Sequence, residues 1–294
     1  MSTIVVAIDF SVSDDRALRR AVIQARSINA GLVLVHVEPD SEPGQLHSQE
    51  ALARAALLKE LARAVNEHDG VACESVISAG TMAEQVALIA EERSANLITV
   101  GRHERGLRDL VAKPATEEIS RRARIPTLIA NSLPLGPYTH ILLGTRLDEP
   151  SAELARWLAG NPLGGAPELS MLYVHDPHTI LPVAGDGRVS PEAPRADEEL
   201  GLAQKALDEF LVGNGLAERV YPRVRLQRGP VSLELDEYAS ELGCDLVAIA
   251  GSEKPFLERL VTGSVAQDVL REIGKDILVC PPGILASGDD GGNG

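Results

Sequence analysis

The sequence predicts an α/β protein with two tandem five-stranded parallel sheets, each covered by helices on both faces. Short apolar runs alternate with amphipathic helical patterns along the chain, which is typical of parallel β-α-β units with right-handed crossovers. The pattern also occurs twice: residues 96–130 and 245–280 each contain an apolar run, a polar turn, an L-x-x-L-V core, a helix and a second apolar run. The chain has 294 residues, enough for two domains of ordinary size. A repeat of ~140 residues indicates a duplicated domain.

In the first copy, a Ser11-x-x-Asp14 capping box marks the start of a helix and Gly31 marks its end. Continuous apolar runs predict buried strands, and we expect them at residues 3–9, 32–37, 71–78, 97–100 and 127–130. The intervening helices are expected at residues 15–29, 50–67, from the Gly80-Thr81 turn to about Ser94, and 116–122.

Residues 131–138 contain two prolines and a glycine and are the expected linker, after which the pattern restarts. Strands or helices are expected at residues 140–144, 150–158, 203–211, 220–227, 231–242, 246–250 and 277–280. A constant shift in numbering relates the copies at first, so that Asp9 corresponds to Arg146 and Val37 to Val174. A longer loop at 177–196 increases this shift in the later elements. The predicted domains are 1–133 and 138–283, with a disordered tail at 284–294.

The composition narrows the class of protein. Aromatic residues make up only 3%, so the core must consist of Leu, Val, Ala and Ile. A net charge of -15 argues against a nucleic-acid-binding or anionic-membrane-binding surface. The three cysteines form no C-x-x-C pair or disulfide framework. We expect no secretory leader at the amino terminus, and no apolar run reaches the ~20 residues of a membrane helix. We expect a cytoplasmic protein.

The stretch 245–280 resembles the carboxyl half of a universal stress protein, and the resemblance covers almost the whole chain, twice. Nucleotide-binding members carry a G-x-x-G-x9-G-[S/T] loop. Here the final pair is Gly263-Ser264, the first glycine falls on Ala250 with Gly251 beside it, and the second falls on Glu253. In the earlier copy the first glycine is Gly101, the second position is Glu104, and the final pair is Lys113-Pro114.

The resemblance implies two Rossmann-like domains, similar to adenine-nucleotide alpha hydrolases, that pair through their last strands. The contact edges would be residues 127–130 and 277–280, which would give an intramolecular pseudo-dimer and protect both sheet edges. Whether pseudo-dimers pair further to a homodimer, and which protein is the partner, stays open.

Gly263-Ser264 precedes a predicted helix, where unpaired N–H groups and the helix dipole favour an anion such as phosphate. A phosphate site here would use Gly263, Ser264 and the amide of Val265. Ser264 and Gln267 also form a capping box, which needs no ligand. Proline at position 114 removes an N–H from the equivalent turn, and carboxylates at Glu104 and Glu253 would repel phosphate.

Ligands of open α/β sheets bind beyond the carboxyl ends of the strands, at the topological switch point. The resemblance implies that Asp9 contacts a ribose there, although Asp9 would equally serve as a helix cap. Arg146, its counterpart, would pair with a phosphate or form a salt bridge with Glu149 or Glu153. The implied site of an ATP-like nucleotide places adenine beside Val174 and phosphates near Gly251, with Val37 and Gly101 at equivalent positions of the first copy.

The sequence contains no nucleophile motif and no Walker loop. His175-x-x-His178 with Asp176 lacks a third fixed ligand, so no metal is expected. We therefore expect a non-catalytic stress-response binding or signalling module with at most one adenine-nucleotide (ATP) site, in the second domain. One alternative is an enzyme, a slow ATP hydrolase or a nucleotide transferase, which would need a metal-binding carboxylate and a base; Glu253 and Asp148 are the candidates. The other is an adaptor that binds no nucleotide, or holds an apolar ligand.

Overall fold

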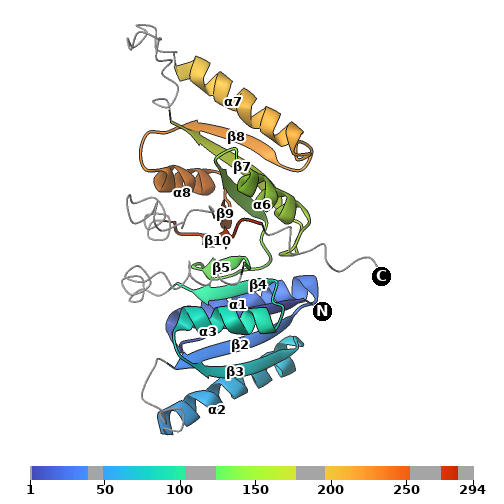
Figure 1. Cartoon of the computed structure of the whole chain (residues 1–294), viewed down its shortest axis with the longest axis vertical. Helices are drawn as coiled ribbons and strands as arrows, with labels where there is room; N and C mark the ends of the chain where they lie inside the picture. The colour runs from blue at the N-terminus through green and yellow to red at the C-terminus, as the bar shows by residue number, and fades with distance from the viewer. Residues whose placement is uncertain (1, 39–48, 103–123, 177–195, 252–272, 284–294) are drawn as a thin grey trace.

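A computed structural model describes residues 2–38, 49–102, 124–176, 196–251 and 273–283. It contains one ten-stranded sheet with the order β3-β2-β1-β4-β5-β10-β9-β6-β7-β8 (Figure 1). The strands are β1 (Thr3–Ala7), β2 (Gly31–Glu38), β3 (Cys73–Ala79), β4 (Leu97–Gly101), β5 (Thr127–Ala130), β6 (His140–Thr145), β7 (Glu168–His175), β8 (Tyr221–Leu226), β9 (Leu246–Ala250) and β10 (Asp276–Cys280). Each half thus has its first strand at the centre, between its second and its fourth, as in doubly wound folds.

The described helices are α1 (Val12–Ile28), α2 (Gln49–Ala64), α3 (Met82–Glu92), α6 (Glu149–Ala159), α7 (Ala196–Gly213) and α8 (Val231–Glu241), and a π-helical turn, Val65–Asp69, follows α2. The helix α1 begins three residues earlier than predicted, because Ser11 is its N-cap. The helix α7 begins seven residues earlier than predicted, and its first turn carries three acidic residues, which favour a helix N-terminus. The helix expected at 116–122 and the tail at 284–294 lie outside the described residues.

The two halves meet where β5 pairs antiparallel with β10, at the contact edges that the family resemblance implied. Leu128 pairs with Leu278, and on either side Ile129 pairs with Ile277 and Thr127 with Val279. Leu278 is the counterpart of Leu128 in the repeat, and the two flanking pairs lie symmetrically on either side of this central pair. A pseudo-twofold axis that relates the two halves therefore passes between the two leucines. All the other strand pairs of the sheet are parallel. The chain is therefore an intramolecular pseudo-dimer, while the domain boundaries 1–133 and 138–283 stay a prediction.

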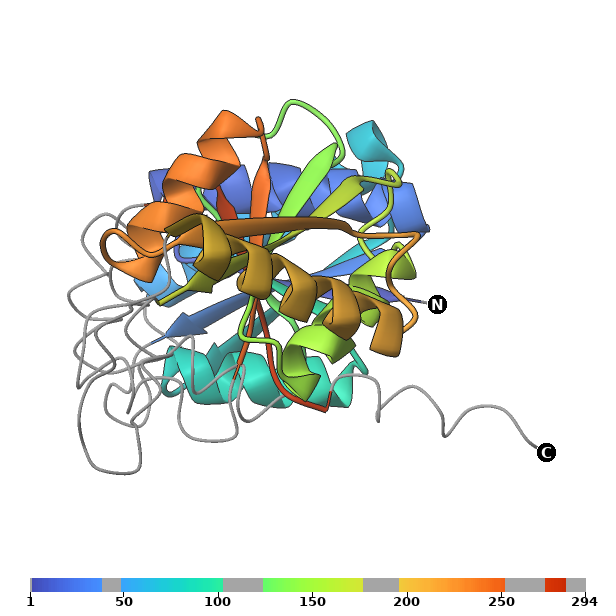
Figure 2. The same ribbon diagram turned by 90° about the horizontal axis from the view of Figure 1, so that it is seen from above.

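The hydrophobic core is continuous on one face of the sheet and divided on the other. Under α1, α2, α6 and α7, a single cluster of buried Leu, Ile, Val and Ala residues runs through both halves. On the opposite face, α3 covers a separate cluster in the first half and α8 covers another in the second. Seen from above, α1 and α3 lie on opposite sides of the strands (Figure 2). The shared cluster ties the halves into one body.

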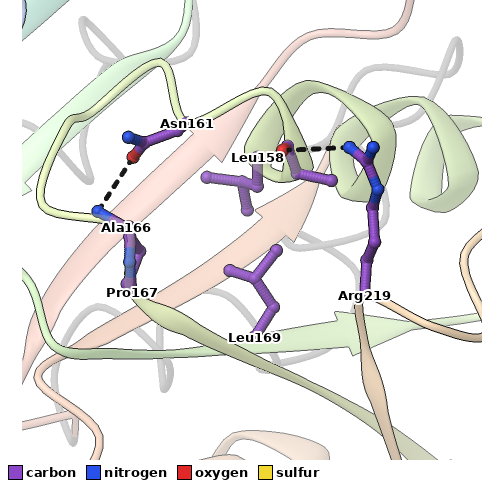
Figure 3. Close-up of a pocket in the computed structure, with 7 residues that line it drawn as sticks. Leu158, Asn161, Ala166, Pro167, Leu169 and Arg219 are labelled. Carbon is purple, nitrogen blue, oxygen red and sulfur yellow. Dashed lines mark hydrogen bonds between the residues drawn. The ribbon is translucent and has the colours of Figure 1, made fainter.

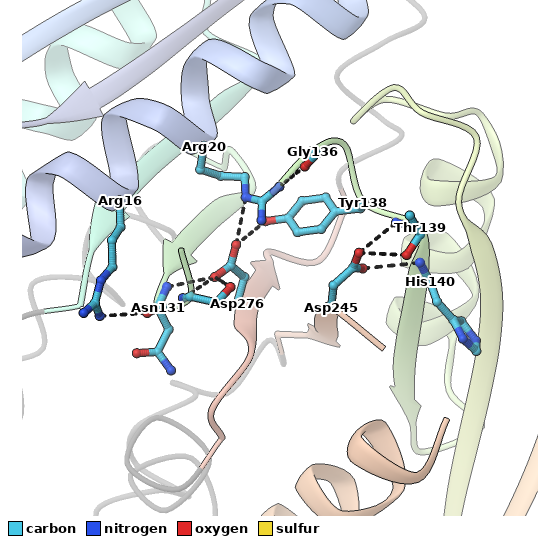
Figure 4. Close-up of polar contacts among 10 residues, drawn as sticks. Arg16, Arg20, Asn131, Gly136, Tyr138, Thr139, His140, Asp245 and Asp276 are labelled. Carbon is cyan, nitrogen blue, oxygen red and sulfur yellow. Dashed lines mark hydrogen bonds and ion pairs between the residues drawn. The ribbon is translucent and has the colours of Figure 1, made fainter. Parts of the chain in front are cut away.

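A buried polar cluster lies at the same joint (Figure 4). The carboxylate of Asp276, at the start of β10, is fully buried and accepts five hydrogen bonds. These come from Arg20 Nε (2.9 Å), Tyr138 Oη (2.8 Å), Asn131 N (2.9 Å), Ser132 N (2.9 Å) and Ser132 Oγ (2.8 Å). The guanidinium of Arg20 also stacks 4.1 Å from the centre of the Tyr138 ring. We call these five residues the Asp276 cluster.

The loop between α6 and β7 contacts both α1 and the linker through two glycines. Gly164 and Gly165 have φ angles of 73° and 77°, which residues other than glycine rarely adopt. A Cβ on Gly164 would lie 2.3 Å from Ser27 Cβ, and a Cβ on Gly165 would lie 2.8 Å from Pro137 Cβ. The loop therefore tolerates no side chain at either position.

We expect Gly164→Ala to lower the free energy of unfolding by about 2–4 kcal/mol, because it combines overpacking with a strained φ. Urea unfolding measures the effect. Gly201→Ala, in α7, is the matched control: its Cβ would meet no atom within 4 Å, so we expect a gain of ~0.5–1 kcal/mol. A Gly164→Ala variant as stable as the parent chain would contradict the observed packing of the loop on α1.

Candidate functional site

Each half places two site residues at neighbouring strand ends. In the first half β1 lies beside β4, which brings Asp9 near Gly101, and in the second half β6 lies beside β9, which brings Arg146 near Ala250. These are the two topological switch points, where the chain leaves the first strand toward one side and the fourth strand toward the other. Asp9 and Gly101 thus belong to neighbouring strand ends of the first half, as Arg146 and Ala250 do in the second.

In the first half, two carboxyl groups share the strand end. The carboxylate of Asp9 accepts from Ser11 N (3.0 Å), and Asp14 Oδ2 accepts from Asp9 N (2.7 Å) and Ser11 N (3.1 Å). Asp9 thus forms part of the cap of α1, one of the two roles considered from the sequence. Burial, together with the hydrogen bond and the charge of Asp9, raises the pKa of Asp14 to about 7. A second anion at this strand end would be repelled.

The first turn of α1 also covers the end of β4. A Cβ on Gly101 would lie 2.7 Å from Ser13 O and 2.8 Å from Ser13 C, so backbone occupies that space. The side chain of Val37 is 5% exposed and packs in the cluster under α3. Neither residue presents an open surface at the strand end of the first half.

In the second half, Arg146 gives the equivalent strand end the opposite charge. Its Nε and Nη2 each lie 2.8 Å from Asp148 Oδ2, and Nη1 donates to Ala250 O at 3.4 Å. The guanidinium thus reaches from the end of β6 to the end of β9. The expected salt bridge to Glu149 or Glu153 was wrong, because Glu149 pairs with Arg156 and Glu153 accepts from Gly283 N.

Asp148 is the partner that the sequence analysis missed for Arg146. It is the N-cap of α6 and accepts from Ser151 N and Ser151 Oγ. Burial raises the pKa of Asp148, but the hydrogen bonds from Ser151 and the charge of Arg146 outweigh it, so the pKa falls below its ordinary value. The D-x-x-S spacing, a helix N-cap pattern followed by proline, was the available signal. A carboxylate engaged in this way is a poor candidate for the metal ligand of an ATP hydrolase.

Gly251 follows β9 and is packed against the end of β10. Its N–H donates to Cys280 O at 2.6 Å, and a Cβ there would lie 3.1 Å from the same oxygen. The amide is therefore engaged within the sheet and is not available to a phosphate. Val174 is partly buried against the cluster under α8. Gly263, Ser264 and Val265, with Glu253 and the Lys113-Pro114 turn, lie outside the described residues.

Metal ligands and thiols are two reactive groups that the described residues allow us to assess. No three His, Cys, Asp or Glu side chains among them are placed to hold a metal, and His178 of the His175-x-x-His178 pair lies outside this set. Burial raises the pKa of the Cys73 and Cys244 thiols to about 12 and that of Cys280 further still. Such thiols stay protonated at neutral pH and are weak nucleophiles.

A pocket of about 290 Å³ lies elsewhere in the second half (Figure 3). It is bounded by the last residues of α6, the loop after them, the first residues of β7 and Arg219. Arg219 donates to Ala159 O at 3.4 Å, and Asn161 accepts from Ala166 N at 3.2 Å. Because α6 starts beside Arg146 and ends here, this pocket is separate from the strand-end site.

Comparison with known proteins agrees with this fold. The model of the universal stress protein family matches residues 1–131 and 137–281, so the chain belongs to the universal stress protein family. No curated protein matches it. A universal stress protein from Archaeoglobus fulgidus aligns with a TM-score of 0.69 at 11% identity, covering 95% of this chain and 96% of that one. A functionally unknown protein from Pseudomonas aeruginosa aligns at 0.61 and 18%, covering 98% and 95%. These likenesses show the fold.

Other structures cover a single half. A universal stress protein from Archaeoglobus fulgidus in complex with dAMP aligns with 44% of this chain and 97% of its own, at 21% identity and a TM-score of 0.36. In the described part of the chain, none of the helices combines the length and the apolar character that a bilayer span requires.

The Asp9–Asp14 pair predicts a pH-dependent stability. The folded-state pKa of Asp14, about 7, lies above its ordinary value of 3.8. Between these values the folded chain keeps a proton that the unfolded chain releases, so stability falls as pH rises from ~4 to ~7. Asp14→Asn keeps the hydrogen bonds without the charge. We expect it to raise the free energy of unfolding at pH 8 by on the order of 2 kcal/mol and to flatten the pH dependence.

Urea unfolding between pH 4 and 8 measures both effects. Asp15→Asn is the matched control, because Asp15 is exposed on the same turn and pairs with Arg19. It should leave the pH profile unchanged. A profile of Asp14→Asn that parallels that of the parent chain would show that Asp14 does not retain its proton.

Proposed function

We propose that this member of the universal stress protein family is a non-catalytic binding or signalling module with at most one adenine-nucleotide site, in its second half. The observation that carries the proposal is the opposite charge of two equivalent strand ends. The first half presents the Asp9–Asp14 carboxyl pair, and the second presents the guanidinium of Arg146. Because nucleotide phosphates are anions, the second strand end attracts them and the first repels them.

In this proposal Arg146 binds a phosphate together with the turn at Gly263, Ser264 and the Val265 amide. Its side chain is 46% exposed, so it can turn from Asp148 toward a ligand. Planar guanidinium groups bind phosphate through paired hydrogen bonds. Val174 would lie beside the adenine. The amide of Gly251 would take no part, because it donates to Cys280 O.

The proposal also states that the protein does not hydrolyse ATP. Asp148 caps α6 and pairs with Arg146, which leaves it poorly placed to bind magnesium. Magnesium-dependent ATP hydrolysis that is lost in Glu253→Ala would overturn this part and favour the slow hydrolase.

Calorimetry with the whole chain tests the site, with ATP, ADP, cAMP and dAMP as probes. Ser264→Pro removes an N–H from the phosphate turn and should abolish binding. Arg146→Gln should weaken ATP binding about 10–100-fold, because hydrogen bonds to charged groups contribute ~1.5–3 kcal/mol. Asp9→Asn, at the equivalent position of the first half, is the matched control and should leave the affinity unchanged. No heat with the parent chain would exclude the nucleotide site, and an effect only in Asp9→Asn would move it to the first half.

A further inference from the structure

The Asp276 cluster is built from unlike contributions of the two halves (Figure 4). Of the five hydrogen bonds that Asp276 accepts, four come from Arg20, Asn131 and Ser132, which precede the exposed linker position Leu135. Only the bond from Tyr138 comes from the second half. Arg20 in turn contacts Asp276 Oδ2, Gly136 O and the Tyr138 ring, all of which follow Leu135. Each half therefore supplies what the other lacks.

The pseudo-twofold axis shows what a pair of like halves would contain. Because Leu128 is the counterpart of Leu278, Pro126 stands where the second half has Asp276. The same correspondence makes Pro281 and Pro282 the counterparts of Asn131 and Ser132, and prolines have no N–H to donate. The correspondence of Asp9 with Arg146 places Trp157 at the position of Arg20. Two second halves would thus bury Asp276 against a tryptophan and two prolines.

The loss of buried partners is what makes such pairs unfavourable, because in a pair of two second halves Asp276 would keep only the hydrogen bond from Tyr138. Asp276 has no exposed surface and Arg20 is 3% exposed. Removing one member of a buried ion pair leaves an uncompensated charge, which is strongly destabilising. Two first halves would leave Arg20 facing proline in the same way. The apolar part of the joint has no such preference, because Leu128 and Leu278 are equivalent and would pair equally well with themselves.

We propose that the Asp276 cluster makes the joint selective, so that the β10 edge accepts the first half of such a chain and rejects a second copy of itself. The β5 edge is selective in the same sense. The surface that fits β10 offers a buried guanidinium and two consecutive backbone N–H groups beside an antiparallel strand.

The experiment uses the whole chain, folded first and then cut. A protease recognition sequence inserted after Leu135 lies at a residue that is 98% exposed, and it leaves Ser132 and Gly136 in place. After cleavage, the protein is mixed with an isotope-labelled copy of itself and incubated in urea. The urea concentration is the lowest at which labelled and unlabelled molecules exchange their halves completely. Native mass spectrometry then counts first-second, first-first and second-second pairs. In the parent chain we expect first-second pairs to exceed like pairs roughly a hundredfold or more.

The double variant Arg20→Leu/Asp276→Leu removes both charges. We expect its halves to re-sort toward the statistical distribution, in which like pairs equal the mixed pairs in number. Arg20→Met/Asp276→Asn, which keeps the size of both side chains, should shift in the same direction. The matched control is Asp15→Leu/Arg19→Leu, an exposed ion pair of α1, which should stay as selective as the parent chain. Like pairs from the parent chain, or full selectivity in both neutral variants, would overturn the proposal.

Discussion

The buried carboxylate of Asp276 is the constraint on which the arrangement of the two halves depends. It requires donors, and those it has come from α1, from the end of β5 and from the linker. The hydrogen bonds that this one carboxylate requires therefore fix the path of the linker, the position of α1 and the register of β10 against β5. The apolar cluster that runs under α1, α2, α6 and α7 adds to this, because it is continuous across the joint. Together they make one body of two repeats.

The repeats share a backbone and differ in chemistry. At the end of β1 the buried carboxyl group of Asp14 and the partly buried one of Asp9 share a capping network, whereas at the end of β6 a guanidinium reaches across to β9. The cap of the following helix changes as well: Ser11 and Asp14 serve α1, and Asp148 serves α6. Both caps supply hydrogen-bond acceptors for N–H groups at the start of the helix, so the fold tolerates either charge at this strand end. The fold therefore does not require the charge difference on which the proposed nucleotide site depends.

Most of the fold could be predicted from the sequence, because strand and helix periodicity is local and the repeat supplied a second copy of every element. The joint between residues 127–130 and 277–280 followed from the family resemblance. Contacts between distant residues could not be predicted, since periodicity gives the face of a residue and not its partner: Arg20 and Asp276 are 256 positions apart. The partner of Arg146 was missed because a turn with Leu147 at a φ of 57° brings Asp148 back toward it. The use of the Gly251 amide by Cys280 likewise depends on strand pairing.

The position of the joint in the chain has a consequence during synthesis. Leu128 and its partner Leu278 are separated by about half the length of the chain, so β5 leaves the ribosome long before β10 exists. At ~5–20 residues per second, roughly 8–30 s pass in which the edge of the first sheet has no neighbour. Such an edge recruits strands from other nascent chains. Because β10 closes this edge and is the last of the described strands, the length of the interval is set by translation speed and not by folding rate.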